Sequence, residues 1–314
     1  MTVTTLTPET PATSRSVSKP IASYGLLSDC NSAALVGSDG SIDWLCLPRF
    51  DAPAVFARLL DPAAGHWSIR PAGEHTSERR YLPHSLVLET IFTTETGSVR
   101  LLDALAFAEG QRGHALGLDA PHELLRSVTG VSGTVDLVLE LAPRPEYGLV
   151  RPLFRQTADG GRTFGGPNQV VVRAGAPVTI EAGTMRAAFT VSEGDEIGFS
   201  LRWAALEGTP VEPTAPADVA ARIADTTEAW SSWEHEHDIY EGPHRELVRL
   251  SSRVLKALTY RPTGAIVAAP TTSLPETVGG ERNWDYRYAW IRDASLTLQA
   301  LYIGTCSDEA ENFV

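Results

Sequence analysis

An eleven-residue segment, Asn283–Asp293, concentrates side chains that could bind a carbohydrate. It reads Asn-Trp-Asp-Tyr-Arg-Tyr-Ala-Trp-Ile-Arg-Asp, with four aromatic rings, two arginines and two aspartates. Aromatic rings can cover the C–H faces of a sugar, while charged groups bind its hydroxyls through charge-assisted hydrogen bonds. This combination of residue types in so short a span indicates one wall of a sugar-binding site.

Four side chains of this motif are the candidate ligands of the sugar: Tyr286, Trp290, Arg292 and Asp293. The Asp293 carboxylate can accept hydrogen bonds from two hydroxyls, and the planar guanidinium of Arg292 can donate to others. The rings of Tyr286 and Trp290 can stack on the sugar. The alternative for the two rings is ordinary core packing, and for the charged pair a helix cap with a structural ion pair.

The motif must be held by the elements on either side of it. A helix is expected over residues 294–303, with Asp293 as its N-cap and Gly304 at its end. Its apolar residues cover more than one stripe, which predicts burial on most sides: Leu296, Leu298, Leu301 and Ile303. The few residues that follow resemble the first turn of another helix, so the chain is expected to be cut inside a helical domain.

Two earlier helices are expected over residues 217–237 and 243–260, where apolar residues recur with helical spacing. Prolines at 210, 213 and 216 punctuate the approach to the first helix and predict a domain boundary. Within the motif, Asp285 and Arg287 are expected to form a buried pair that positions the segment.

Before this boundary the pattern is that of β-strands, from residue 21 to about residue 206. Short apolar runs flank turns that contain glycine, which predicts a series of hairpins: 32–37 with 41–46, 85–92 with 99–105, and 123–131 with 135–141. Short strands with regular turns favour an antiparallel β-sandwich. One short helix is expected inside it, over residues 54–60.

Composition excludes several classes of function. A net charge of −13 argues against nucleic acid and anionic membranes as partners, and no apolar run is long enough to span a bilayer. Residues 1–20 are rich in Thr, Ser and Pro, which predicts a disordered tail without the apolar core of a signal peptide. Cys30, Cys46 and Cys306 lack metal-ligand spacing and are expected to be buried or half-buried thiols in a reducing cytoplasm.

The motif resembles the first conserved region of the catalytic domain of glycoside hydrolase family 15, which holds glucoamylases and bacterial trehalases. A second stretch, Ile21–Asp51 with its Gly-Ser-Ile-Asp-Trp-Leu-Cys-Leu-Pro-Arg-Phe-Asp end, resembles the trehalase-like N-terminal β domain of the same proteins. The resemblance implies a β-sandwich N-terminal domain followed by the start of an all-α (α/α)6 toroid, a truncated six-hairpin glycosidase. The expected divisions are a tail (1–20), the sandwich (21–210), a linker with the first helices (211–282) and the toroid start (283–314).

For the four candidate residues, the resemblance implies that Arg292 and Asp293 bind hydroxyls of the terminal sugar in the innermost subsite. Trp290 and Tyr286 would line that pocket, which opens at the mouth of the toroid. The N-terminal region is implied to pack near this mouth, so that three further residues are expected to approach the substrate: Asp43, Trp44 and Arg49.

The implied function is inverting hydrolysis of α-glucosidic bonds, with release of glucose from trehalose or α-glucan ends and with no cofactor or metal. An inverting glycosidase needs a carboxylic acid and a carboxylate base. In the family both are glutamates of later regions, so no catalytic residue is expected in this chain, which is expected to be inactive alone. Two alternatives remain: a non-catalytic carbohydrate-binding or scaffold module, and another toroid glycosidase of the dextran or uronate type.

Overall fold

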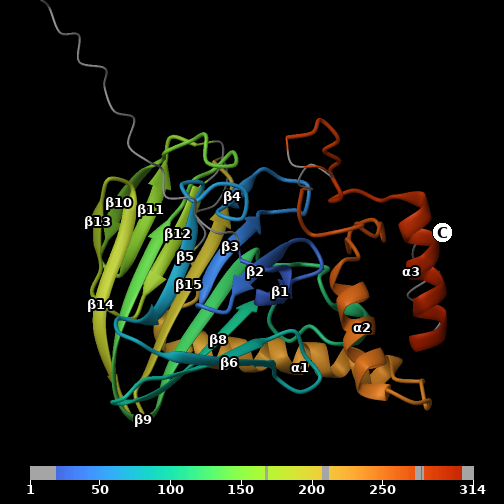
Figure 1. Cartoon of the computed structure of the whole chain (residues 1–314), viewed down its shortest axis with the longest axis horizontal. Coiled ribbons are helices and arrows are strands. Elements are labelled where there is room, and N and C mark those ends of the chain that lie inside the picture. The colour runs from blue at the N-terminus through green and yellow to red at the C-terminus, as the bar shows by residue number, and fades with distance from the viewer. Residues whose placement is uncertain (1–18, 167–168, 207–211, 273–276, 278, 306–314) are drawn as a thin grey trace, which may run out of the picture.

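The computed structural model describes residues 19–166, 169–206, 212–272, 277 and 279–305 (Figure 1). The expectations for most of the tail, for Cys306 and for a further helix after residue 305 lie outside these residues. The strands are β1 (Tyr24–Ser28), β2 (Ala33–Gly37), β3 (Ser41–Cys46), β4 (Ala54–Phe56), β5 (His66–Pro71), β6 (Thr76–Tyr81), β7 (Leu88–Thr93), β8 (Gly97–Leu105), β9 (Glu123–Ala142), β10 (Leu153–Thr157), β11 (Gly160–Phe164), β12 (Gln169–Ala174), β13 (Thr179–Glu181), β14 (Thr184–Ser192) and β15 (Glu196–Ala204). The helices are α1 (Val219–His237), α2 (Arg245–Ala257) and α3 (Ile291–Gly304), with short 3-10 turns at η1 (Ile21–Ser23), η2 (Gly113–Ala115) and η3 (Pro216–Asp218).

The strands pair antiparallel and build two layers that share the long strand β9 (Figure 1). Alternate side chains of both layers point inward, as the period of two along a strand requires. They form the main core, whose largest members are almost inaccessible to solvent: Phe56, Trp67, Phe92 and Phe199. Burial of each such side chain contributes roughly 1.5–3 kcal/mol to folding. A large antiparallel β domain followed by a few helices is therefore confirmed.

Strand β9 corrects one of the predicted hairpins. The expected pairing of 123–131 with 135–141 is wrong, because residues 132–134 continue the strand instead of reversing it. Its first half pairs with β8 and β15, and its second half pairs with β14 and β5. Gly133, with φ of +58°, lies at the passage between the two sets of partners, beside a shift in the β8 register. The glycine signal marks an irregularity inside a strand, where a positive φ favours glycine.

The short helix expected over residues 54–60 is also wrong. Residues 54–56 form strand β4, which pairs with the end of β3, and a turn follows. All three side chains of β4 are buried. A helix would place only part of this run against the core, so tertiary burial overrides the local helical pattern.

Helices α1 and α2 form as predicted and pack on the β domain, with α1 crossing behind the lower part of the strands in Figure 1. Trp230 and Trp233 of α1 are 1% exposed and join a cluster with Phe107, whose ring meets Trp230 edge-on at 5.1 Å between centroids. Ala257 at the end of α2 belongs to the same cluster, and its carbonyl accepts a hydrogen bond of 2.7 Å from the Ser28 hydroxyl. The helices are therefore anchored to the sandwich by apolar burial.

Helix α3 differs from its prediction in two ways. It begins at Ile291, so the N-cap is Trp290, and Asp293 lies in the first turn without a capping hydrogen bond. A carboxylate in the first turn still interacts favourably with the helix dipole. The expected burial on most sides is wrong, because only Ala294, Leu301 and Gly304 are buried and Leu296 is 61% exposed.

Strand β5 carries a buried histidine on the face of the sheet that points away from the core. Trp67 and Ile69 point inward, whereas His66, which precedes Trp67 and points the opposite way, lies under the outer surface and is 4% exposed. Its Nε2 atom is 3.3 Å from a carboxylate oxygen of Glu140 on β9. Burial, reinforced by the nearby Arg58 guanidinium, lowers the pKa of His66 from 6.5 to about 4.

This histidine is expected to make the fold sensitive to mild acid. The unfolded chain protonates His66 near pH 6.5 and the folded chain only near pH 4, so stability is lost as pH falls between these values. Between pH 7 and pH 5 the free energy of unfolding should fall by about 2 kcal/mol more in the wild type than in His66→Gln. Urea unfolding of both proteins at the two pH values measures this difference. Equal losses in the two proteins would contradict the assignment.

Candidate functional site

The motif runs as an extended segment into α3 and is hydrogen-bonded to the connector at residues 265–272. The backbone amides of Ala268 and Ala269 donate to the carbonyls of Tyr288 and Tyr286, at 3.1 and 2.9 Å. The connector is fixed in turn by the β domain, because the indole Nε1 of Trp44 on β3 donates to the Pro270 carbonyl at 2.8 Å. The backbone of the motif is therefore aligned by the sandwich through the connector.

Arg287 fastens the motif directly to the sandwich. Its buried guanidinium holds the Asp285 carboxylate at 2.7 Å and donates to the Tyr147 hydroxyl and the Ala52 carbonyl, both at 2.8 Å. Burial alone would raise the pKa of Asp285, but the hydrogen bonds from Arg287 hold it below its usual value. The predicted pair is present, but only Arg287 is buried, since the Asp285 side chain is 31% exposed. Arg287 extends the pair to loops of the β domain.

Cys46, at the end of β3, lies beside this guanidinium, with its Sγ 3.5 Å from Nη1 of Arg287. Burial raises the pKa of the Cys46 thiol to about 12, against the opposing effect of the arginine charge. The thiol is therefore neutral at physiological pH and poorly suited to act as a nucleophile. Cys30 and Cys46 are both buried, as expected for structural thiols.

The structure brings the four predicted sugar ligands together as two pairs. The rings of Tyr286 and Trp290 stack, with centroids 5.1 Å apart and an interplanar angle of 30°. The Trp290 indole also donates to the Asp285 carbonyl at 3.3 Å, which ties the stacked pair to the clamped part of the motif. Both rings are half-buried, so one part of the stack packs on protein while the rest is open to a ligand.

The second pair begins helix α3. Arg292 Nη2 lies 3.0 Å from Asp293 Oδ2, and the two side chains are 72% and 34% exposed. An exposed pair of this kind contributes little to folding stability. Its donors and acceptors are accessible to hydroxyl groups of a ligand.

A pocket of about 210 Å³ lies next to the motif, between it and the β domain. It is lined by Arg49, Phe50, Asp51, Tyr260, Ala265, Val267, Arg287, Tyr288 and Ala289. The four predicted ligands are not among these residues. Arg49, which was expected to approach the substrate, does reach this pocket, where its guanidinium is paired with Asp51 at 2.9 Å.

Tyr288 is the residue of the motif that the sequence reasoning missed. It is 51% exposed and lines the pocket. Aromatic residues recur with a period of two, at 284, 286, 288 and 290. This period is typical of an extended segment and could have predicted that Tyr288 is exposed.

The two other residues expected near the substrate lie in the interior. Trp44 is fully buried, and Asp43 is 1% exposed and bound by the Lys19 ammonium at 2.8 Å and the Tyr24 hydroxyl at 3.0 Å. Neither side chain presents a surface to a ligand, so the expectation is wrong for both. Their role is to fix the hairpin and, through Trp44, the connector.

Comparison with known proteins matches the β domain and the helical part of the chain to two family models. Residues 14–203 match the model of the trehalase-like N-terminal family, and residues 242–314 match that of the glycosyl hydrolases family 15. The chain belongs to the trehalase-like proteins of glycosyl hydrolase family 15. The resemblance seen in the two motifs is thereby confirmed.

Curated relatives of this family 15 chain include a trehalase from Mycolicibacterium smegmatis, 39% identical over 94% of this chain and 46% of the relative. A trehalase from Mycobacterium tuberculosis is 38% identical over 94% of this chain and 45% of the relative. The chain thus spans about half the length of the curated relatives it matches.

Among solved structures, a bacterial glucoamylase complexed with acarbose matches this family 15 chain with a TM-score of 0.58. The match covers 92% of this chain and 48% of the glucoamylase, at 13% identity, and shows likeness of fold alone. In the part of the family 15 chain that the structure describes, no helix combines the length and apolar character needed to cross a membrane.

Proposed function

We propose that this chain forms part of an inverting hydrolase of α-glucosidic bonds that releases glucose from trehalose or from the ends of α-glucans. In this proposal the motif is one wall of the site and binds the terminal sugar. Family membership, the relatives named trehalase and the glucoamylase-like fold support it. We further propose that α3 is an early helix of an (α/α)6 toroid.

The observation that carries the proposal is the pairing of an open aromatic stack with an accessible Arg–Asp pair. The stacked rings of Tyr286 and Trp290 offer an apolar surface to the C–H face of a glucose unit. Arg292 and Asp293 follow within one helical turn and offer a fixed fork of donors and a carboxylate acceptor. Binding of the terminal sugar through its hydroxyls would hold the glucosidic bond in a defined place.

Cleavage with inversion requires an acid that protonates the leaving oxygen and a base that activates water on the opposite face of the sugar. In enzymes of this type the two carboxyl groups lie about 6.5–9.5 Å apart. We assign neither role to a residue of this chain. Asp293 is a binding carboxylate in this proposal, because its neighbour Arg292 supplies a donor 3.0 Å away and its side chain is accessible to a sugar hydroxyl.

The proposal is tested with the protein produced from its complete reading frame. Trehalose and maltotriose are supplied separately, and proton NMR follows the anomeric signals of the released glucose. We expect hydrolysis of at least one substrate, with β-glucose released first from an α-linked bond. Binding of trehalose without hydrolysis of either sugar would favour a non-catalytic binding module, and initial release of α-glucose alone from maltotriose would contradict inversion.

A further inference from the structure

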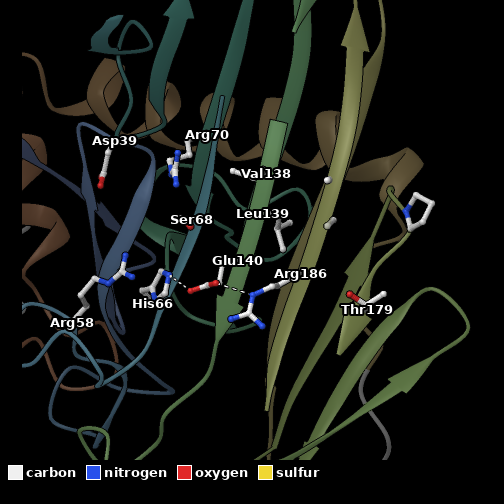
Figure 2. Close-up of a pocket in the computed structure, with 13 residues that line it drawn as sticks. Asp39, Arg58, His66, Ser68, Arg70, Val138, Leu139, Glu140, Thr179 and Arg186 are labelled. Carbon is white, nitrogen blue, oxygen red and sulfur yellow. Dashed lines mark hydrogen bonds and ion pairs between the residues drawn. The ribbon is translucent and has the colours of Figure 1, made fainter. Parts of the chain in front are cut away.

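A second pocket lies on the face of the β domain that points away from its core (Figure 2). It has a volume of about 700 Å³. We call it the outer pocket and define it by its charged lining residues and one histidine: Asp39, Arg58, His66, Arg70, Glu140 and Arg186. No residue of the motif lines it, so it is a separate feature from the proposed sugar wall.

Strand alternation builds the floor of the outer pocket. Ser68 on β5 and Arg186 on β14 both stand opposite Glu140 of the central strand β9. Side chains that pair across strands in this way point to the same face. Their neighbours in sequence, such as Trp67, point into the core instead. The polar group is therefore fixed by the same register that buries the sandwich interior.

The Glu140 carboxylate is held in place from two sides (Figure 2). One oxygen lies 3.3 Å from Nε2 of His66, and the other accepts from Nε of Arg186 at 2.9 Å. A carboxylate has about four lone-pair directions, so this arrangement leaves acceptor capacity directed at the pocket. Glu140 is thus a preoriented acceptor.

Two further guanidiniums have more donors than the described residues engage. Nη1 of Arg70 donates to the carbonyl oxygen of the next residue, Pro71, at 3.2 Å. Arg58 Nη1 contacts the Ser41 hydroxyl at 3.2 Å and lies 3.9 Å from the Asp43 carboxylate. Each guanidinium carries five N–H donors. Most of these donors are available to a ligand in the pocket.

The charges of the outer pocket are mixed, with three guanidiniums against two carboxylates, in a chain of net charge −13. Arginine is suited to phosphate and carboxylate groups because its planar fork matches their geometry. Carboxylates such as Glu140 repel an anionic group but accept hydrogen bonds from hydroxyls. Among the described residues, the lining includes no Phe, Tyr or Trp, so a ligand here is held by polar contacts instead of by ring stacking.

From this combination we infer that the outer pocket binds an acidic sugar, meaning a mono- or disaccharide that carries a phosphate or a carboxylate group. The acidic group is bound by Arg70 and Arg58, and the hydroxyls are bound by Glu140 and Asp39. This function is distinct from hydrolysis at the motif and does not depend on it.

Calorimetric titration of the protein with glucose 6-phosphate, glucuronate, glucose and inorganic phosphate tests the inference. We expect one of the two acidic sugars to bind at least tenfold more tightly than glucose or phosphate, and the better of the two identifies the acidic group. Failure of both acidic sugars to bind would overturn the inference. Phosphate binding as tight as that of glucose 6-phosphate would overturn the sugar part and leave a simple oxyanion site.

Two variants assign the contacts. Arg70→Met should weaken the acidic sugar roughly tenfold or more, because one charge-assisted contact is lost. Glu140→Gln should weaken the acidic sugar while leaving the binding of inorganic phosphate equal or stronger, since a repelling charge is removed. The matched control is Arg155→Met on β10, an exposed arginine outside the pocket, which should change neither affinity. An equal loss of affinity in Arg155→Met would overturn the assignment.

Discussion

Replacing Asp293 by alanine is expected to reduce kcat/KM for trehalose or maltotriose by at least about a hundredfold in the protein produced from its complete reading frame. In the proposed site this carboxylate accepts from two sugar hydroxyls, and each charge-assisted hydrogen bond contributes about 1.5–3 kcal/mol. Arg292 would also lose its partner, which lies 3.0 Å away in the structure. Initial rates of glucose release across substrate concentration measure the effect.

The fold should tolerate this substitution, because Asp293 makes no capping hydrogen bond and its ion pair with Arg292 is exposed. Glu246→Ala is the matched control. Glu246 lies in the first turn of α2 and pairs with Arg249 three residues later, so its removal costs a similar helix-dipole interaction far from the motif in sequence. The kcat/KM of Glu246→Ala should stay at the wild-type value. A wild-type rate for Asp293→Ala, in a protein with unchanged thermal unfolding, would refute the binding role.

A second large effect is expected in the core of the sandwich, where Asp103→Ala should lower the free energy of unfolding by about 3–5 kcal/mol. Asp103 and Arg126 are both fully buried and joined by a hydrogen bond of 2.7 Å. The same guanidinium donates to the backbone carbonyls of Trp67 at 2.8 Å and Gly40 at 2.7 Å. Without the carboxylate, a positive charge would remain in an apolar interior. Urea unfolding measures the loss.

Two comparisons isolate the cause of this loss. Asp136→Ala removes an exposed carboxylate of β9 that contacts only the Thr190 hydroxyl among its described hydrogen bonds, and should cost less than about 0.5 kcal/mol. The double variant Asp103→Leu with Arg126→Met replaces the ion pair by apolar groups and should recover much of the stability. A single Asp103→Ala variant as stable as Asp136→Ala would show that the buried arginine tolerates the loss of its partner.

Local patterns in the sequence predict most elements of this fold because those elements are specified locally. The hairpin of β2 and β3 turns at an Asp-Gly pair, and α1 and α2 follow a helical period of apolar residues. The errors occur where distant contacts decide. Residues 54–56 are a strand because β3 lies beside them, and residues 132–134 continue β9 because it has partners in both layers.

In the candidate site, too, the sequence predicts the local features, while the contacts between distant residues appear only in the folded chain. Residue types alone single out Tyr286, Trp290, Arg292 and Asp293, and the structure places them as two local pairs. No local sequence pattern can predict the partners of Arg287, because Tyr147 is 140 residues away in sequence and Ala52 is 235 residues away. The pocket beside the motif combines residues from the β domain, the connector and the motif, which only the folded chain brings together.

The anchoring of the motif by Arg287 bears on how proteins of this family can be recombined. One guanidinium is shared by the motif and by two loops of the sandwich, at residues 46–52 and 143–152. In a chimera that joins the helical region to the β domain of another protein, Arg287 would no longer meet the partners that it has in this chain. Crossover points for protein engineering therefore need to be chosen so that Arg287, Tyr147 and Trp44 come from the same parent.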